Sequence, residues 1–329
     1  MNGRRVSVRR GRFKGWEALL VERPPLALAL VPQVGGRIMG MSWRGRQLAF
    51  TMPGLEGRVE DVAAVADLRR RKRELGFPLW GGDKTWLAPQ ARWSEGVPFL
   101  DLDSGAYASE VEMEGPEEAL VRMTSPVCRE TGVRVTRTVT LEQEEEGWTV
   151  IHRLENASDR EVEWGPWDVA MVLRPGRVYL PTRAQSPHPE GIKTFVEEGV
   201  SAEVRERVVS YLGSVAVVAC EDTLQFKFGS DAEEGWMLGV VDVGGGDLIG
   251  YRKQVAVVPG ASYGHGCVAE VFNSADYPYL EMEIHGPVVR LAAGASTELV
   301  EHQALIDIAR WPQSEEELRQ HLAALACPP

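Results

Sequence analysis

The stretch GCVAEVFNSADYPYLEMEIHGPVVRLAAGAS (residues 266–296) contains two short segments with the pattern of β-strands. CVAEVF (267–272) is rich in β-branched and aromatic residues, and YLEMEI (279–284) alternates strictly between two kinds of side chain. Alternation with a period of two residues is typical of strands, because successive side chains point to opposite faces of a sheet. This stretch therefore predicts two neighbouring strands and no helix.

Segments of the same kind run through the rest of the chain, separated by turn residues. They are residues 26–31, 132–141, 148–155, 169–173, 211–219, 224–228, 236–243, 255–258 and 297–305. Because the strands follow one another without regular intervening helices, the pattern favours a large all-β sandwich over an alternating β/α architecture.

Two segments have helical features. Residues 56–75 (EGRVEDVAAVADLRRRKREL) carry apolar residues near helical spacing, and residues 314–325 open with a capping box formed by Ser314 and Glu317. The basic run 69–73 is interpreted as a solvated helix end, with a phosphate-binding patch as the alternative. We find no internal repeat or linker, so we expect one domain over residues 1–329, with a helical insert near 56–75 and a C-terminal helix at 314–325.

Composition narrows the classes of partner and compartment. The chain has 329 residues, 44% of them hydrophobic, and a net charge of −12, which argues against nucleic acid as the main partner. Its four cysteines lack the spacing of a zinc site. The apolar stretch after the arginine-rich start is broken by charged residues and prolines at 22–25, so we expect neither a signal peptide nor a membrane span. The expected location is the cytoplasm.

The segment FPLWGGDKTWLAPQ (77–90) is the densest group of unusual residues. Indole rings such as Trp80 and Trp86 can stack on the apolar faces of sugar rings, while Asp83, Lys84 and Gln90 can hydrogen-bond to hydroxyl groups. The alternative is a tight loop with tryptophans in the core.

A second group, WGPWD (164–168), precedes a predicted strand. Trp167 could form another wall of a ligand cleft, and Asp168 could bind a hydroxyl or exchange a proton. A tryptophan packed at the entrance of a strand is the equally simple alternative.

A third group is YGHGCVAEVFN (263–273). In a strand over 267–272, the side chains of Val268, Glu270 and Phe272 share one face. Glu270 is then either at an edge or a deliberately buried acid, and burial would raise its pKa toward the range of a general base. His265 lies near enough to share its pocket. For the strand that follows, by contrast, we expect Glu281 and Glu283 to face solvent.

Several of these groups, in order, resemble segments of galactose-mutarotase-like proteins. The matching stretches are VGGRIMGMSW (34–43) with GRQL (45–48), GGDKTWLAPQ (81–90), HRLENASDREVEWGPWDVAMVLRPG (152–176) and GCVAEVFNSADYPYLEMEIHGPVVRLAAGAS (266–296). Together they cover most of the chain, and residues 81–90 look like a segment of a little-characterised bacterial branch. The resemblance implies an all-β supersandwich with a few short helices and a sugar-binding cleft on its concave face.

The family also implies a chemistry. Aldose 1-epimerases interconvert sugar anomers with a glutamate base and a histidine acid, and Glu270 matches that base. The histidines do not carry over, because this chain has PWDVA (166–170) where a related branch has a histidine-containing strand. A proton donor would then have to be Asp168, Lys84 or His265.

The sequence therefore predicts a protein that binds a small carbohydrate, with epimerase activity through Glu270 as one hypothesis. Trp80, Trp86 and Trp167 would form stacking walls. The side chains expected to contact hydroxyl groups are Arg37, Asp83, Lys84 and Gln90. Pairing with a carboxylate at the edge of the core is the alternative for Arg37. The competing hypothesis is a non-catalytic binding module that lost the histidines, and a third is an accessory domain of a lyase or hydrolase. No cofactor or metal is expected, and the oligomeric state stays open.

Overall fold

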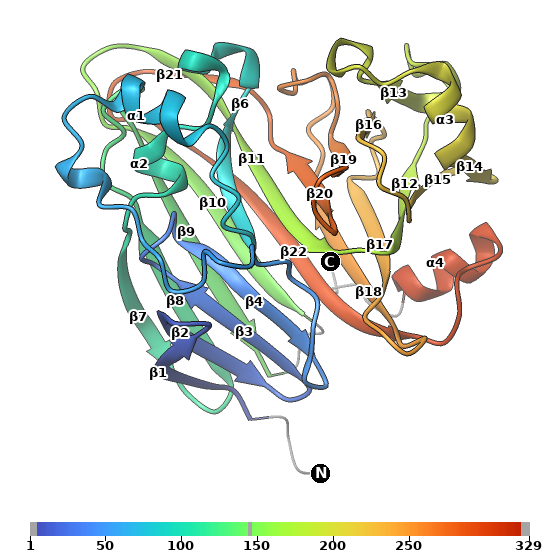
Figure 1. Cartoon of the computed structure of the whole chain (residues 1–329), viewed down its shortest axis with the longest axis horizontal. Coiled ribbons are helices and arrows are strands. Elements are labelled where there is room, and N and C mark those ends of the chain that lie inside the picture. The colour runs from blue at the N-terminus through green and yellow to red at the C-terminus, as the bar shows by residue number, and fades with distance from the viewer. Residues whose placement is uncertain (1–4, 144–146, 324–329) are drawn as a thin grey trace.

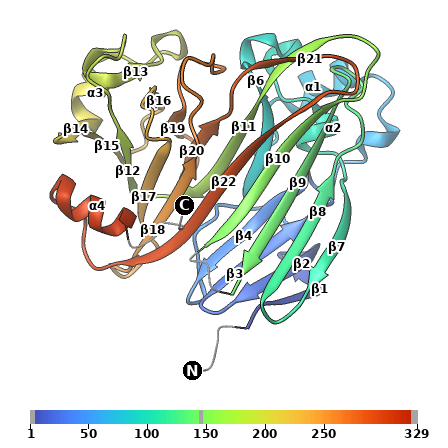
Figure 2. The ribbon, with the colours of Figure 1, turned by 180° about the vertical axis from the view of Figure 1, so that it is seen from behind.

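The computed structural model describes residues 5–143 and 147–323. The chain forms two large antiparallel sheets of twelve and ten strands, with an apolar core between them (Figures 1 and 2). The predicted all-β sandwich is thus confirmed.

The larger sheet combines strands from the whole length of the chain. Its order is β1 (Ser7–Phe13), β2 (Trp16–Arg23), β3 (Leu26–Val31), β4 (Arg37–Trp43), β6 (Asp83–Ala88), β11 (Val162–Leu173), β20 (Tyr279–His285), β19 (Ala269–Asn273), β16 (Phe226–Ser230) and β13 (Ile192–Thr194), with β5 (Arg46–Gln47) beside β4 and β21 (Val289–Leu291) beside β11.

The smaller sheet packs against it. Its order is β14 (Val209–Leu212), β15 (Val215–Cys220), β12 (Gly176–Pro181), β17 (Trp236–Asp242), β18 (Leu248–Val255), β22 (Ser296–Ile308), β10 (Trp148–Asn156), β9 (Val133–Glu142), β8 (Glu118–Thr124) and β7 (Ala108–Glu114). Figure 2 shows the long strand β22, drawn in red, beside β10 in this sheet.

The helices lie at the flanks, α1 (Leu68–Leu75) and α2 (Leu100–Asp103) on one side and α3 (Ala202–Val208) and α4 (Glu315–Ala323) on the other (Figures 1 and 2). Short 3₁₀ turns complete the elements: η1 (Val62–Ala64), η2 (Gln90–Arg92), η3 (Ser94–Gly96), η4 (Pro189–Gly191) and η5 (Val196–Glu198). None of the helices in the described part of the chain is long and apolar enough to cross a membrane.

Several sequence predictions need correction. The helix expected over 56–75 is instead two separate elements, the 3₁₀ turn η1 and the helix α1. The Asp61 carboxylate caps the first turn of η1 and the Asp67 carboxylate caps the first turn of α1, so each element begins anew. Ser314 does cap α4, accepting from the Glu317 N–H at 3.2 Å, but residues 324–325 lie outside the described residues. The strand expected over 211–219 is interrupted after Leu212 and continues as β15, and β18 ends at Val255, so 255–258 is no separate strand.

The centre of the larger sheet sets the positions that matter for function. Strands β6, β11, β20, β19 and β16 are neighbours although their residues are widely separated in sequence (Figure 1). The register places Trp167 opposite Trp86 on one side and opposite His285 on the other. Glu270 lies directly opposite Glu283. Side chains from four predicted segments therefore meet on one surface.

Candidate functional site

The larger sheet has two chemically different faces, because side chains alternate along each strand. On β16, Phe226 and Phe228 point into the core between the sheets, so Lys227 points outward. On β20, Met282 packs against the smaller sheet at Gly239. Its neighbours Glu281 and Glu283 therefore lie on the outer face. The same face carries Trp86 of β6, Trp167 of β11 and Glu270 of β19.

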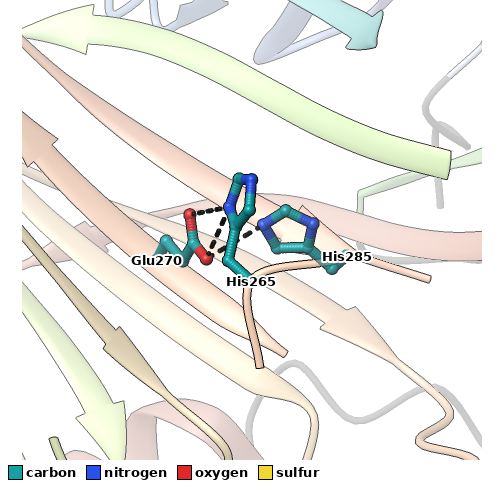
Figure 3. A group of neighbouring side chains, drawn as sticks. All are labelled: His265, Glu270 and His285. Atoms are coloured by element: carbon teal, nitrogen blue, oxygen red, sulfur yellow. Dashed lines mark hydrogen bonds and ion pairs between the residues drawn. The ribbon is translucent and has the colours of Figure 1, made fainter. Parts of the chain in front are cut away.

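Glu270 is the centre of a buried polar group on this outer face (Figure 3). His265 Nδ1 lies 3.0 Å from Glu270 Oε1 and 3.1 Å from Oε2, and His285 Nε2 lies 3.2 Å from Oε1. Glu270 and His285 are fully buried, and 12% of the His265 side chain is exposed. Glu270 is therefore the buried acid of the two possibilities that its sequence left open.

Lys227 joins Glu270 to a second carboxylate. Its Nζ lies 2.9 Å from Glu270 Oε2 and 2.9 Å from Glu283 Oε2. Glu283 Oε2 also accepts a hydrogen bond of 2.9 Å from the Trp167 indole N–H. Within the described residues, Glu283 Oε1 is buried and has no hydrogen-bond partner. We call Lys227, Glu270 and Glu283 the lysine–carboxylate trio.

The two carboxyl groups of the trio have opposite pKa shifts. The expected rise in the pKa of Glu270 is wrong. Burial acts to raise it, but Lys227, His285 and His265 more than offset burial and hold the pKa well below the usual value. For Glu283, burial outweighs Lys227 and, with the negative charge of Glu270, raises the pKa to about 8. At neutral pH this gives one ionised and one protonated carboxyl group, an arrangement that separates a base from an acid.

The two histidines have different roles beside Glu270. His265 Nε2 accepts a hydrogen bond of 3.3 Å from the Gln90 backbone N–H, which leaves the proton on Nδ1, where it is donated to Glu270. Burial lowers the pKa of His285 to about 4, so its ring is neutral at neutral pH. His285 Nε2 contacts Glu270 Oε1 at 3.2 Å, while Nδ1 is buried and has no hydrogen-bond partner among the described residues.

These side chains could also be considered as metal ligands. One ligand atom each of His265, Glu270 and His285 lie within 4.8 Å of one another. The Lys227 ammonium already contacts Glu270, however, and the Gln90 N–H requires a lone pair on His265 Nε2. Nδ1 is then protonated, and the group as it stands is organised by hydrogen bonds and ion pairs.

The outer face continues from the trio toward the first strands. Lys84 lies 3.3 Å from Glu281 and 4.2 Å from the centre of the Trp86 ring. The Trp86 indole N–H donates to Asp103 Oδ1 at 2.8 Å. Arg37 binds the same Asp103 oxygen at 2.6 Å, and both side chains are fully buried. The alternative expectation for Arg37, pairing with a carboxylate, is therefore confirmed.

Trp80 belongs to the far end of this face. Its indole N–H donates to Ser104 Oγ at 2.9 Å, and its ring packs with Trp16, Val31 and Met39. It is separated from Glu270 by the intervening strands β6, β11 and β20. Of the three tryptophans predicted as walls, Trp86 and Trp167 contact each other, with ring centres 5.1 Å apart.

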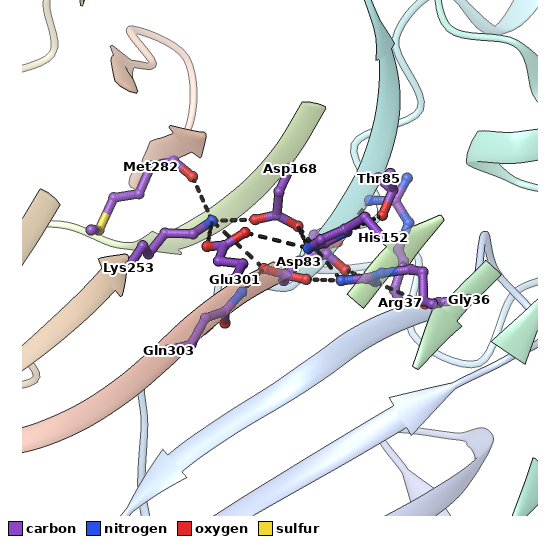
Figure 4. A network of polar contacts seen from close by, with 12 residues as sticks. Gly36, Arg37, Asp83, Thr85, His152, Asp168, Lys253, Met282, Glu301 and Gln303 are labelled. Atoms are coloured by element: carbon purple, nitrogen blue, oxygen red, sulfur yellow. Dashed lines mark hydrogen bonds and ion pairs between the residues drawn. The ribbon is translucent and has the colours of Figure 1, made fainter. Parts of the chain in front are cut away.

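Asp83 and Asp168 lie on the opposite, inner face of the sheet (Figure 4). Asp83 pairs with Arg137 of β9, and Asp168 pairs with Lys253 of β18, both in the smaller sheet. Lys253 Nζ also lies 3.3 Å from Glu301 Oε1. All five side chains are buried, so they form an ionic cluster between the sheets. Sequence proximity to Lys84 and Trp167 suggested a shared site, but alternation turns the two aspartates away from Glu270.

The structure corrects the expectation that Glu281 and Glu283 face solvent. Glu283 is fully buried, and only 12% of the Glu281 side chain is exposed. The alternation was assigned correctly, but β20 is a central strand between β11 and β19, and its outer face is covered. Lys227, Glu283 and His285 were missed as site residues. The signal that points to Glu283 and His285 is the antiparallel pairing of 267–272 with 279–284, which sets Glu283 opposite Glu270. Lys227 lies on β16, which pairs with the other edge of β19.

Aromatic side chains and a loop cover the trio. Trp93 packs on Trp167 with ring centres 5.5 Å apart, and the His265 ring meets Trp167 edge-on at 4.8 Å. Phe195 lies 6.1 Å from the His265 ring, and the Lys193 ammonium donates to the His265 carbonyl at 3.0 Å. The β18–β19 connection and residues 192–198 therefore close over Glu270 in this conformation.

The inner cluster gives a stability prediction. Lys253→Met leaves Asp168 and Glu301 buried without their shared cation, and breaking a buried pair in this way costs about 3–5 kcal/mol. We expect a loss of that size in the free energy of unfolding, measured by urea denaturation. Arg153→Met is the control: it removes the cation of an exposed pair with Glu298, worth less than about 1 kcal/mol. Equal small losses in both variants would contradict the account.

The trio gives a coupling prediction. Lys227→Met and Glu270→Gln each destabilise the fold, but the double variant should lose less than the two losses added, by about 0.5–3 kcal/mol. The reason is that part of the loss in Lys227→Met comes from leaving the buried Glu270 carboxylate without its cation, and Glu270→Gln has already removed that charge. The matched control combines Lys227→Met with Glu301→Gln, on the other side of the sheet, and should be additive within about 0.5 kcal/mol. An additive Lys227–Glu270 pair would show that the two groups are not coupled.

Comparison with known proteins gives matches in structure alone. No protein-family model matches the chain, and no curated protein matches it. A proposed aldose 1-epimerase from Klebsiella pneumoniae is similar with a TM-score of 0.60 and 13% identity, over 96% of this chain and 85% of that one. A galactose mutarotase-like protein from Clostridium acetobutylicum is similar with a TM-score of 0.55 and 10% identity, over 92% of this chain and 99% of that one. A proposed mutarotase from Salmonella typhimurium is similar with a TM-score of 0.56 and 11% identity, over 92% of this chain and 94% of that one.

The chain is also similar to part of a TPR-domain containing protein from Parabacteroides distasonis, with a TM-score of 0.54 and 12% identity, and spans half the length of that protein. At identities this low, the likeness concerns the arrangement of the strands. The chain has the galactose-mutarotase-like fold, as the resemblance of its sequence motifs implied.

Proposed function

We propose that this chain binds a small carbohydrate on the outer face of the larger sheet and interconverts its anomers, with Glu270 as the base that takes the proton of the anomeric hydroxyl. The observation that carries the proposal is the position of Glu270, a fully buried acid on the outer face of the sheet that contacts Lys227 and His265. Its charged neighbours hold its pKa below the usual value, so the carboxylate is ionised and free of a proton before reaction. The similarity to solved mutarotase-like structures supports the same conclusion.

The surroundings of Glu270 suit this role. Lys227 stabilises the carboxylate, and in the closed conformation His265 holds its orientation through Nδ1–H. The Trp167 ring lies directly beside the histidines, 4.8 Å from the ring centre of His265. Trp167 is buried, with His285 stacked on it at 5.1 Å and Trp93 packed against it at 5.5 Å, so its ring can stack on the apolar side of a sugar only when Trp93 moves with the cover.

Glu270 reaches a sugar only when the cover over it moves. The residues to be displaced are His265, Phe195 and Trp93. His265 then loses the 3.0 Å hydrogen bond from Lys193 to its carbonyl and the contacts of its ring with Glu270 at 3.0 Å and with the Gln90 N–H at 3.3 Å. Each of these hydrogen bonds is worth about 0.5–1.5 kcal/mol net, so the binding energy of the ligand has to offset the loss of several of them. We therefore propose that the β18–β19 connection swings outward to admit the sugar.

A binding module without catalysis is the second candidate. The observation that favours it is the closed state of the site, with Glu270, Glu283 and His285 all fully buried. In this case the ionic groups would hold the fold together, and a sugar would bind without exchange of its anomers.

The test is anomer exchange on a panel of free aldoses, followed by NMR saturation transfer. We expect exchange above the buffer rate with the unmodified protein, and a loss of about 100-fold or more in Glu270→Gln, in line with the contribution of a general base. Glu301→Gln is the matched control, because it removes a buried carboxylate beside a lysine on the inner face.

Two outcomes contradict the proposal in different ways. If a sugar stabilises the protein but exchange stays at the buffer rate, the chain is a binding module. If no sugar at millimolar concentration raises the melting temperature and none is exchanged, the carbohydrate role itself is wrong.

A further inference from the structure

The proposed anomer exchange, on which the assignment below rests, needs a proton donor as well as the base Glu270. We propose that Glu283 is the proton donor to the ring oxygen of the sugar, so that the reaction runs between two carboxyl groups held by one lysine. The sequence left the donor open among Asp168, Lys84 and His265.

Geometry places Glu283 where a donor is needed. Glu270 and Glu283 are directly opposite each other on adjacent antiparallel strands and point to the same face. Lys227 Nζ contacts one oxygen of each at 2.9 Å. The anomeric hydroxyl oxygen and the ring oxygen of a pyranose are bonded to the same carbon, so a base and an acid must act from neighbouring positions. Two side chains in cross-strand register satisfy this requirement.

The hydrogen bonds of Glu283 define which oxygen is available. Oε2 accepts from both the Lys227 ammonium and the Trp167 indole N–H. Oε1 is buried and, across the described residues, has no partner. A carboxyl group in this setting carries its proton on Oε1, because Oε2 already faces two donors. The unpaired Oε1–H then has an unmet need for an acceptor, which a ring oxygen would supply.

Charge balance requires one mobile proton. Two ionised carboxylates and one ammonium would leave a net negative charge in a fully buried site, and burial makes such a charge costly. One proton shared between Glu270 and Glu283 makes the trio neutral. Lys227 contacts both carboxyl groups, so it stabilises the negative charge whichever of the two carries it.

The other candidate donors fit less well. Asp168 lies on the inner face, where it pairs with Lys253. Lys84 is engaged with Glu281 and with the Trp86 ring. His265 already donates its Nδ1 proton to Glu270, and the neutral ring of His285 has no extra proton to give at neutral pH.

One proton passes from the sugar to Glu270 and one from Glu283 to the sugar. Glu270 takes the proton of the anomeric hydroxyl, the C1–O1 bond becomes a carbonyl, and the C1–O5 bond breaks. Glu283 gives its proton to O5, so the sugar opens to the neutral aldehyde while the charge moves from Glu270 to Glu283. After rotation about C1–C2, O5 attacks the other face of C1. Glu283 recovers its proton from O5, and Glu270 returns its proton to O1.

The donor role predicts a particular pH dependence. Burial is the main cause that raises the pKa of Glu283, and with the charges of Lys227, Glu270 and Glu281 it puts the pKa at about 8. Glu198 of η5 also faces Lys227 and Glu270. An acid must be protonated to donate, so exchange should fall as the pH rises above about 8. The same raised pKa means that the folded state holds a proton that the unfolded chain releases near pH 4, so the contribution of Glu283 to stability declines as the pH rises from about 4 to about 8.

The experiment compares Glu283→Gln with Glu270→Gln and the Glu301→Gln control in aldose exchange over pH 5–10. We expect Glu283→Gln to lose about 100-fold or more and to lose the alkaline fall, while Glu301→Gln keeps both the rate and the profile of the unmodified protein. Circular dichroism establishes that each variant is folded. If Glu283→Gln does not fold, Glu281→Gln is compared instead: the negative charge of Glu281 helps to raise the pKa of Glu283, so its removal should move the fall in rate to lower pH, and an unmoved fall overturns the assignment.

The outcomes separate the two proposals. An active protein in which Glu270→Gln is inactive but Glu283→Gln retains full exchange overturns the donor assignment and leaves the base assignment standing. An active protein with no fall in rate above pH 8 also overturns it. Absence of exchange on every aldose overturns the proposed function and this inference with it.

Discussion

The contact on which the outer-face site depends is that of the Lys227 ammonium with Glu270 and Glu283. The lysine and both carboxyl groups are buried, so water cannot screen or solvate their charges. The positive charge of Lys227 balances one negative charge. Of the two carboxyl groups, Glu270 is the one that stays ionised, because two histidines also lie beside it. Burial, together with the negative charge of Glu270, raises the pKa of Glu283 in spite of Lys227. Burial of two acids around a single cation thus creates an ionised group and a protonated group side by side, which is the condition for moving a proton through the pair.

The alternation of side chains along strands explains why the same sheet holds two separate ionic groups. Trp167 and Asp168 are consecutive, yet one packs beside the histidines and the other pairs with Lys253 between the sheets. The inner cluster joins the two sheets through β6 and β11 on one side and β9 and β18 on the other (Figure 4). The inner cluster therefore fixes the central strands of the larger sheet against the smaller sheet, while the lysine–carboxylate trio lies on their outer face.

Sequence reasoning predicted the fold from local pattern, because strands 26–31, 148–155 and 279–284 each carry an apolar or alternating run close to their observed limits. It also singled out Glu270 and His265, which the structure brings together. Lys227 could not be found this way, since the segment 224–228 shows only a short apolar strand with one lysine, and its importance depends on β16 lying beside β19. Glu283 was assigned to solvent because an alternating strand does not reveal whether a loop covers its polar face.

The protonation state of the trio is the central claim, and it can be measured directly. Carbon-13 NMR of glutamate side-chain carboxyls, with Glu270 and Glu283 assigned by their Gln variants, follows each group from pH 5 to 9. The account predicts that Glu270 stays ionised throughout and that Glu283 loses its proton near pH 8. Two carboxyl signals that are both ionised from pH 5 upward would contradict it.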